Sequence, residues 1–336
     1  MSYFIVFLVC FLMLLLVISQ SSSLEAAGAK NRFDFSWLKT FMFFSPLFLM
    51  TAFRNINVGI DTMQYYYLFN NVGITVPISW SEPVFYYVMI FLRGVGVSFS
   101  DFIFVQAFFY YLVLSSLITI LPRKNHLAYV MIVATIFLYH FGMSGMRQSF
   151  AISLVLLSIF SLLRGKYITY FGFAIVAFGV HNSSIIPFLL MFLAHHIELS
   201  DKRFIIGLAV SPVFSFFNPS FLIGSQNIAI KQLSKFDSES VQLLSVKIPI
   251  SIWFFTLFIS FLMIYGNRLR IVLWDPVIND NFPAKNLILF GTIYMNCFLW
   301  LATSVRLTDR VSFYFVPFFA ILVAWILSSL KKTYEG

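Results

Sequence analysis

The chain alternates between long apolar segments and short polar connections along almost its whole length. Within each apolar segment the hydrophobic residues are continuous and do not alternate with polar ones, so the pattern predicts helices and not barrel strands. In a bilayer every backbone amide and carbonyl must find a hydrogen-bond partner inside the protein, which a helix provides. We therefore predict an all-α, polytopic integral membrane protein, with residues 1–336 forming a single helical bundle.

Two apolar segments in the middle of the chain organise the prediction. They are Gln148–Leu163 and Tyr167–Val180, joined by the basic turn Arg164-Gly165-Lys166. A helix rises ~1.5 Å per residue, so each segment roughly crosses the hydrocarbon layer. Arg147 and His181 stand at the far ends of the pair. If both segments cross, these two residues emerge at one membrane face, opposite the basic turn.

The remaining apolar segments extend this pattern to about eleven spans. Tyr3–Ile18 has no basic residue before it, so we predict an uncleaved first span and not a signal peptide. Val84–Val97 is short and carries Arg93, which favours an interfacial or re-entrant helix over a full span. The other predicted spans are Phe41–Phe53, Phe102–Leu121, His126–His140, Ile185–Ala194, Phe204–Phe217, Ile248–Tyr265, Asn286–Ala302 and Val311–Leu330.

Two connections are long and polar, and we place both on the outer face. Residues 53–83 are rich in Asn, Gly, Pro and Ser, which predicts a loop with irregular backbone. In that reading Tyr65–Tyr67 are aromatics at the membrane surface. Residues 218–247 form the second outer-face loop.

Composition and charge agree with a membrane protein and set its orientation. Of the 336 residues, 60% are hydrophobic and 10% are charged, and the net charge is +9. The basic residues lie in small groups between apolar segments, which is a topology signal and not a nucleic-acid surface. The predicted cytoplasmic segments hold 14 of the 22 basic residues, so the C-terminus is expected inside. The two cysteines, Cys10 and Cys297, lie in apolar segments and suggest neither a disulfide nor a metal site.

The predicted outer face collects the residues that are able to carry chemistry. Arginine forks suit phosphate and carboxylate oxygens, and a histidine can act as acid or base near neutral pH. The alternatives are salt bridges, such as Arg310 with Asp309 or Arg54 with Asp61, snorkelling arginines, and a histidine that caps a helix. No nucleotide or metal motif is present, so no cofactor is expected. The outer-face candidates are Arg54, Asp61, Glu82, Arg147, His181, Arg306, Asp309 and Arg310.

Five motifs in order along the chain resemble the EpsG family, the branch of Wzy-type membrane polymerases that assemble exopolysaccharide, capsule or O-antigen. The most specific pair is Arg147-Gln148, which opens one helix, and His181-Asn182-Ser183, about 35 residues later. Asp61-Thr62 with Tyr65 matches the end of the first motif. The five motifs read FRNINVGIDTMQYY, EPVFYYVMIFL, GMRQSFAISLVLLS, AFGVHNSSIIPF and VRLTDRVSFYFVPF.

The resemblance implies a reaction and a location. A growing glycan on undecaprenyl diphosphate would be transferred to another lipid-linked repeat unit, on the outer face of the bacterial inner membrane. We expect Arg147, Arg310 and Arg54 to bind the diphosphate, and His181 or Asp61 to act as base. Gln148, Glu82, Arg306 and Asp309 are secondary candidates. Expected partners are the lipid-linked oligosaccharide, the bilayer, and as further candidates a chain-length regulator and a flippase, but no nucleic acid.

Two other functions use some of the same residues. An O-antigen ligase-like transferase shares the outer arginine and histidine chemistry and differs from a polymerase in its acceptor, so composition does not separate the two. A flippase or transporter of lipid-linked oligosaccharide is expected to place polar residues within its spans along a path. Here the predicted spans are mostly free of charge and the charges lie at one rim, which disfavours transport.

Overall fold

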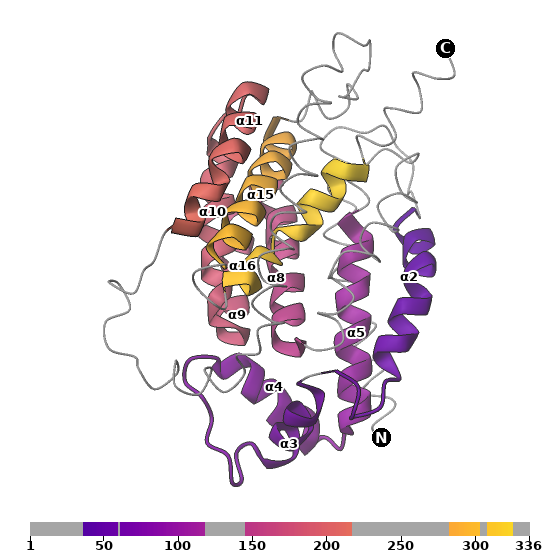
Figure 1. Ribbon diagram of the computed structural model, residues 1–336. Helices are drawn as coiled ribbons and strands as arrows, with labels where there is room; N and C mark the ends of the chain where they lie inside the picture. The colour runs from indigo at the N-terminus through magenta and orange to yellow at the C-terminus, as the bar shows by residue number, and fades with distance from the viewer. Residues whose placement is uncertain (1–35, 60, 118–144, 217–281, 303–307, 325–336) are drawn as a thin grey trace, which may run out of the picture.

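The computed structural model describes residues 36–59, 61–117, 145–216, 282–302 and 308–324, and these residues are helical apart from their connections (Figure 1). The predicted all-α class is confirmed for this part of the chain. The predicted spans Tyr3–Ile18, His126–His140 and Ile248–Tyr265 lie outside the described residues, as does the 218–247 connection. The count of about eleven spans therefore stays a prediction.

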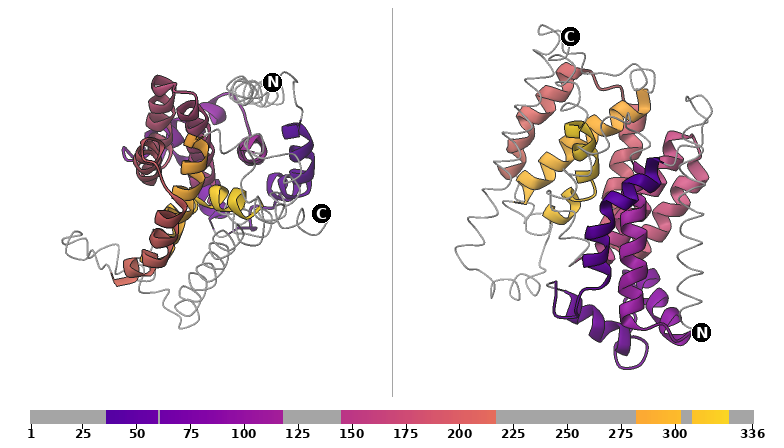
Figure 2. Two further views of the ribbon diagram at one scale, coloured as in Figure 1. Left: turned by 90° about the horizontal axis from the view of Figure 1, so that it is seen from above. Right: turned by 90° about the vertical axis from the view of Figure 1, so that its right-hand side faces the viewer.

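The first half of the bundle is a helix pair with a small hairpin beneath it. The helices are α2 (Ser36–Ala52), α3 (Thr62–Asn71), α4 (Pro83–Gly94) and α5 (Phe99–Ser116). α2 packs along α5, and the two lie side by side in both views of Figure 2. α5 begins with a capping box, in which Ser98 and Asp101 satisfy each other's backbone amides. α3 and α4 lie across the lower end of the bundle in Figure 1.

The second half is built on an antiparallel hairpin. α8 (Met146–Leu163) and α9 (Tyr167–Val180) match the two central predicted segments, and Gly165 takes a positive φ of 68° in the turn between them. Only glycine adopts this conformation at little cost. The chain continues through η3 (Asn182–Ser184), α10 (Ile185–His196), α11 (Asp201–Val210) and η4 (Ser211–Phe216). It returns with α15 (Phe282–Leu301) and α16 (Thr308–Ser312), and residues 316–324 are helical again.

Three of the described helices are long and apolar enough to cross a membrane, namely Phe99–Ser116, Met146–Leu163 and Pro283–Leu301. They indicate a multi-pass membrane protein. α4 has 12 residues. At ~1.5 Å per residue it is shorter than the ~30 Å hydrocarbon core, which favours the predicted interfacial or re-entrant position.

The prediction of irregular backbone over residues 53–83 was wrong in part, because Thr62–Asn71 form the regular helix α3. Arg93 near the end of α4 explains how these two short helices are held together. Its two terminal nitrogens donate to the carbonyls of Phe69 and Val72, each at 2.7 Å. These carbonyls belong to the last turn and C-cap of α3, where the helix itself supplies no partner. Arg93 thus joins α3 and α4 into one hairpin.

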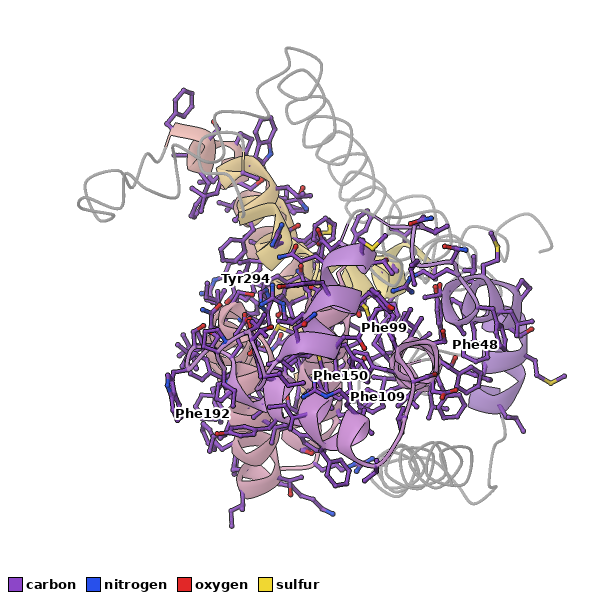
Figure 3. All side chains as sticks on the ribbon, turned by 90° about the horizontal axis from the view of Figure 1, so that it is seen from below. Phe48, Phe99, Phe109, Phe150, Phe192 and Tyr294 are labelled. Carbon is purple, nitrogen blue, oxygen red and sulfur yellow. The ribbon has the colours of Figure 1, made fainter. Side chains whose placement is uncertain are left out.

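The core between these helices contains many aromatic side chains, several of which are labelled in Figure 3. Phe69 of α3 stacks on Phe102 of α5 with ring centroids 5.4 Å apart. Phe109 of α5 packs against Phe150 of α8 at 5.2 Å. Such pairs add about 0.5–1.5 kcal/mol each to the burial of apolar area. They fix α3 and α8 on the same helix, α5.

The two ends of the bundle differ in chemistry. The end that holds the 164–166 turn also holds the ion pair between Lys285 and Asp201, at 3.2 Å. There the Asn286 side chain accepts from the Leu199 amide and donates to the Ile197 carbonyl, which ties α15 to the chain after α10. The opposite end holds α3, α4, the start of α8 and the end of α9 (Figure 1).

The contact between α4 and α9 depends on a glycine and gives a first testable prediction. A Cβ at Gly179 would overlap the Val84 side chain, whereas a Cβ at Gly172 in the same helix would meet nothing within 4 Å. Replacing glycine by alanine inside a helix favours folding by about 1 kcal/mol, but overpacking costs about 1–3 kcal/mol. We expect Gly179→Ala to lower the thermal unfolding temperature of the purified protein and Gly172→Ala to keep or raise it. Equal unfolding temperatures for the two variants would contradict this close approach.

Candidate functional site

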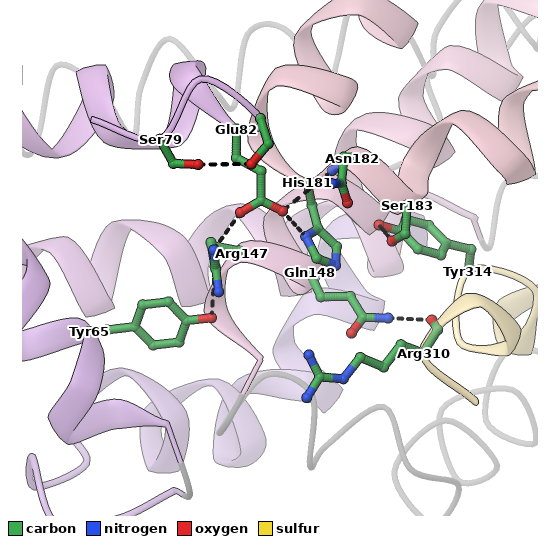
Figure 4. Close-up of polar contacts among 11 residues, drawn as sticks. Tyr65, Ser79, Glu82, Arg147, Gln148, His181, Asn182, Ser183, Arg310 and Tyr314 are labelled. Carbon is green, nitrogen blue, oxygen red and sulfur yellow. Dashed lines mark hydrogen bonds and ion pairs between the residues drawn. The ribbon is translucent and has the colours of Figure 1, made fainter. Parts of the chain in front are cut away.

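The carboxylate of Glu82 is the centre of a polar cluster at the α3–α4 end of the bundle (Figure 4). One oxygen accepts from Nη1 of Arg147, and the other lies 2.5 Å from Nδ1 of His181. The Asn182 amide adds a longer hydrogen bond of 3.4 Å to the oxygen that faces His181. The start of α4, the start of α8 and the end of α9, which are far apart in sequence, therefore meet at the Glu82 side chain.

Local sequence explains how each partner reaches this point. Glu82 directly precedes α4, and Pro83 occupies the first position of that helix, where its missing N–H costs nothing. Arg147 lies in the first turn of α8, and His181 is the residue that ends α9. Because α8 and α9 form a hairpin, these two residues lie at the same end. The structure places them at one end of the hairpin, opposite the basic turn, and their common membrane face stays a prediction.

Arg147 is held from a second side by Tyr65 of α3. Its Nε donates to the Tyr65 hydroxyl at 3.3 Å, and its guanidinium carbon lies 5.6 Å from the centre of the ring. The interpretation of Tyr65 as a membrane-surface aromatic was wrong, because its side chain is 5% exposed, whereas its neighbours Tyr66 and Tyr67 are exposed. Arg147 is thereby fixed by one hydrogen bond to α3 and one ion pair to Glu82.

Gln148 joins the C-terminal part of the chain to this cluster. Its Nε2 donates to the backbone carbonyl of Arg310 in α16. Nearby, the Ser183 and Tyr314 hydroxyls lie 3.4 Å apart, which links η3 to the segment after α16. This hydrogen bond holds the backbone of Arg310 in place. The side chain of Arg310 is exposed at the surface. The start of α8, which carries Arg147, therefore lies next to Arg310 of α16 (Figure 4).

Glu82 is ionised at neutral pH although it is only 6% exposed. Burial by itself raises the pKa of this carboxyl, but the hydrogen bond from His181 and the charge of Arg147 outweigh that effect and hold the pKa below its usual value of 4.5. Glu82 pairs with Arg147, and Arg310 lies next to Gln148 as a second arginine at the same end of the bundle. Two arginines at this end of the bundle suit an anionic ligand.

Nε2 of His181 and Nη2 of Arg147 have no hydrogen-bond partner among the described residues. Both side chains reach the surface, with exposed fractions of 14% for His181 and 28% for Arg147. Glu82 holds one nitrogen of each group, and each group keeps a second nitrogen that a ligand is able to bind.

Not every predicted site residue joins this cluster. Arg54 is buried at the end of α2, where it donates to the Thr51 carbonyl at 2.9 Å, and burial lowers its pKa to about 10. Asp61 is the N-cap residue of α3, one turn before Tyr65, and its side chain makes no cap hydrogen bond. Arg306 and the side chain of Asp309 lie outside the described part of the structure. Within that part no three His, Cys, Asp or Glu side chains are grouped as a metal site.

Residues 36–336 match the family described as the EpsG family. The chain belongs to the EpsG family. This membership covers almost the whole chain and implies a role in polysaccharide biosynthesis. No curated protein and no solved structure matches the chain. The family predicted from the five sequence motifs is thus confirmed, and in this EpsG-family protein the first four motifs each supply a residue of the cluster, namely Tyr65, Glu82, Arg147 and His181.

The central place of Glu82 was not predicted, although the residue was among the secondary candidates. Sequence offered one signal, the Glu-Pro pair that starts a helix. This signal marks a helix boundary and says nothing of what the carboxylate binds. Tyr65 and Tyr314 were also missed as partners, because a tyrosine next to an apolar segment reads equally well as a surface aromatic.

The lowered pKa of Glu82 makes a prediction about acid stability. Since the folded-state pKa lies below the unfolded-state value, the stabilising contribution of Glu82 is present above about pH 4.5 and is lost as the pH falls through the folded-state pKa. At neutral pH we expect Glu82→Gln to unfold at a lower temperature than the wild type, because Arg147 loses its carboxylate. Thermal unfolding between pH 7 and pH 3.5 should show this difference shrinking below pH 4.5. Parallel curves over the whole range would contradict the lowered pKa.

Proposed function

We propose that this protein is a membrane glycosyltransferase that polymerises undecaprenyl-diphosphate-linked oligosaccharide repeat units into a surface polysaccharide. The observation that carries the proposal is the pairing of Arg147 and His181 on one buried carboxylate. It puts a phosphate-binding group and a proton-accepting group side by side. Each also keeps a nitrogen without a hydrogen-bond partner among the described residues, so both are able to contact bound substrates at one place.

The donor substrate requires positive charge in the site, to stabilise the diphosphate as it leaves. A lipid diphosphate is already an activated leaving group, and negative charge builds on it as the bond to the sugar breaks. Arg147, with Nη2 available, and the exposed Arg310 offset that charge in the transition state. Arg54 remains a third candidate, at the end of α2.

The acceptor substrate needs a base for its attacking hydroxyl group. His181 suits this role because it adjoins Arg147 at the same carboxylate and its Nε2 has no hydrogen-bond partner among the described residues. Asp61 is the alternative base, since it lies one turn before Tyr65, which contacts Arg147. Geometry favours His181, which is bonded into the cluster directly.

The proposed setting is the outer face of the bacterial inner membrane. The 164–166 turn and the first turns of α11 and α15, which carry Lys202, Arg203 and Lys285, lie at the end of the bundle opposite the cluster. Basic residues favour the cytoplasmic side, so the cluster faces outward in a bundle of about eleven spans. The lipid-linked substrates would meet it at the level of the headgroups.

The test is an electrophoretic profile of surface polysaccharide from a deletion strain complemented with variants of the gene. We expect Arg147→Ala to reduce the ladder to a single repeat unit, with a loss of polymer of at least about 100-fold, the scale for removing one charge-stabilising donor. Arg203→Ala, an exposed arginine at the opposite end, is the matched control and should give a wild-type ladder.

Other outcomes identify other functions. Loss of even the single-unit band in the deletion strain would point to ligation or export. A normal ladder from Arg147→Ala at normal protein levels would disprove the diphosphate role of this residue. A ladder that is unchanged by the deletion, in a strain with no second polymerase, would disprove the polymerase function.

A further inference from the structure

We propose that Glu82 is a positioning residue that keeps His181 in the one tautomer able to accept a proton at Nε2. This inference rests on the proposed function, because it concerns the base of the same reaction. It assigns separate roles within the cluster. Glu82 orients the base for proton transfer, and Arg147 binds the diphosphate.

The tautomer follows from hydrogen-bond chemistry. Oε1 of Glu82 lies 2.5 Å from Nδ1 of His181. An ionised carboxylate accepts hydrogen bonds and donates none, so Nδ1 must carry the hydrogen. In a neutral imidazole the other nitrogen then holds the lone pair. Nε2 is therefore the basic atom, and no described residue occupies it.

The same contact assists the reaction as charge moves. The acceptor hydroxyl gives its proton to Nε2 while its oxygen bonds to the anomeric carbon of the donor sugar. The bond between that carbon and the phosphate oxygen breaks, and its electron pair leaves on the lipid diphosphate. His181 becomes a cation beside the buried carboxylate, whose attraction is strong because it is shielded from water. The proton passes to solvent once the product leaves.

Arg147 uses the other oxygen of the same carboxylate. Its Nη1 bonds to Oε2, while its Nε bonds to Tyr65. Two of its nitrogens are thus engaged, and Nη2 has no hydrogen-bond partner among the described residues. The negative charge of Glu82 partly cancels the attraction of Arg147 for an anion. Removing that charge should therefore slow proton transfer without weakening the binding of diphosphate.

The test measures these two properties separately in Glu82→Gln. The amide keeps the size of the side chain but loses the charge, and it is able to present its NH2 group to Nδ1 and select the wrong tautomer. Polymer yield in the complemented deletion strain should fall about 10²- to 10⁴-fold, as general-base catalysis is lost. Binding of undecaprenyl diphosphate to the purified variant, measured by thermal stabilisation, should be as tight as in the wild type or tighter.

Three comparisons make the test specific. Glu198→Gln removes an exposed carboxylate at the opposite end and should leave yield and binding unchanged. Glu82→Asp retains the charge and should give at least about fivefold more polymer than Glu82→Gln, as expected when the carboxylate itself matters. In a His181→Ala background, Glu82→Gln should lower the remaining yield by less than about threefold, because residues that act as a unit are not additive.

Several results would overturn the inference. One is an unchanged polymer yield in Glu82→Gln, and another is a loss of diphosphate binding in Glu82→Gln that parallels its loss of yield. An equal loss of polymer yield in Glu82→Asp and Glu82→Gln would also overturn it. So would effects of Glu82→Gln and His181→Ala on polymer yield that multiply in the double variant. If Glu82→Gln does not accumulate, the comparison with His181→Ala is made with Glu82→Asp. Failure of the wild type itself to bind undecaprenyl diphosphate or to make polymer would instead overturn the proposed function.

Discussion

A buried carboxylate held by an arginine and a histidine is the constraint on which the α3–α4 end of this protein depends. An ionised carboxyl group removed from water is costly unless charges and hydrogen bonds replace its solvation. Glu82 obtains them from Arg147, His181 and the Asn182 amide. Because these groups lie at the ends of α8 and α9, α4 is fixed against that hairpin. The close contact between Val84 and Gly179 allows this approach.

The same constraint connects parts of the chain that make no direct contact with Glu82. Tyr65 brings α3 to Arg147, and Gln148, the next residue of α8, holds the backbone of α16 at Arg310. Aromatic packing of Phe69 and Phe85 on Phe102 supports the α3–α4 hairpin from behind. The polar groups are therefore held by rigid helices, which is how a site keeps its geometry before a substrate arrives.

Sequence predicted the parts of the fold that depend on local pattern. The bounds of α9 and the shared end of Arg147 and His181 follow from segment lengths and one glycine turn. The role of Glu82 could not be read in the same way, because it depends on how α4 packs on α9, a contact between residues far apart in the chain. Tyr65 shows a similar limit. Three consecutive tyrosines have the same local signal, yet one is buried and two are exposed.

Arg93 gives the hairpin of α3 and α4 a property that hydrophobic packing alone would not. Its fork reaches two carbonyls at once, Phe69 and Val72, so it fixes the direction of α4 relative to the end of α3 as well as their separation. A lysine presents a single point of charge and would not fix that angle. Arg93 thus helps to set the positions of Tyr65 and Glu82 on either side of Arg147, although its own hydrogen bonds are with Phe69 and Val72.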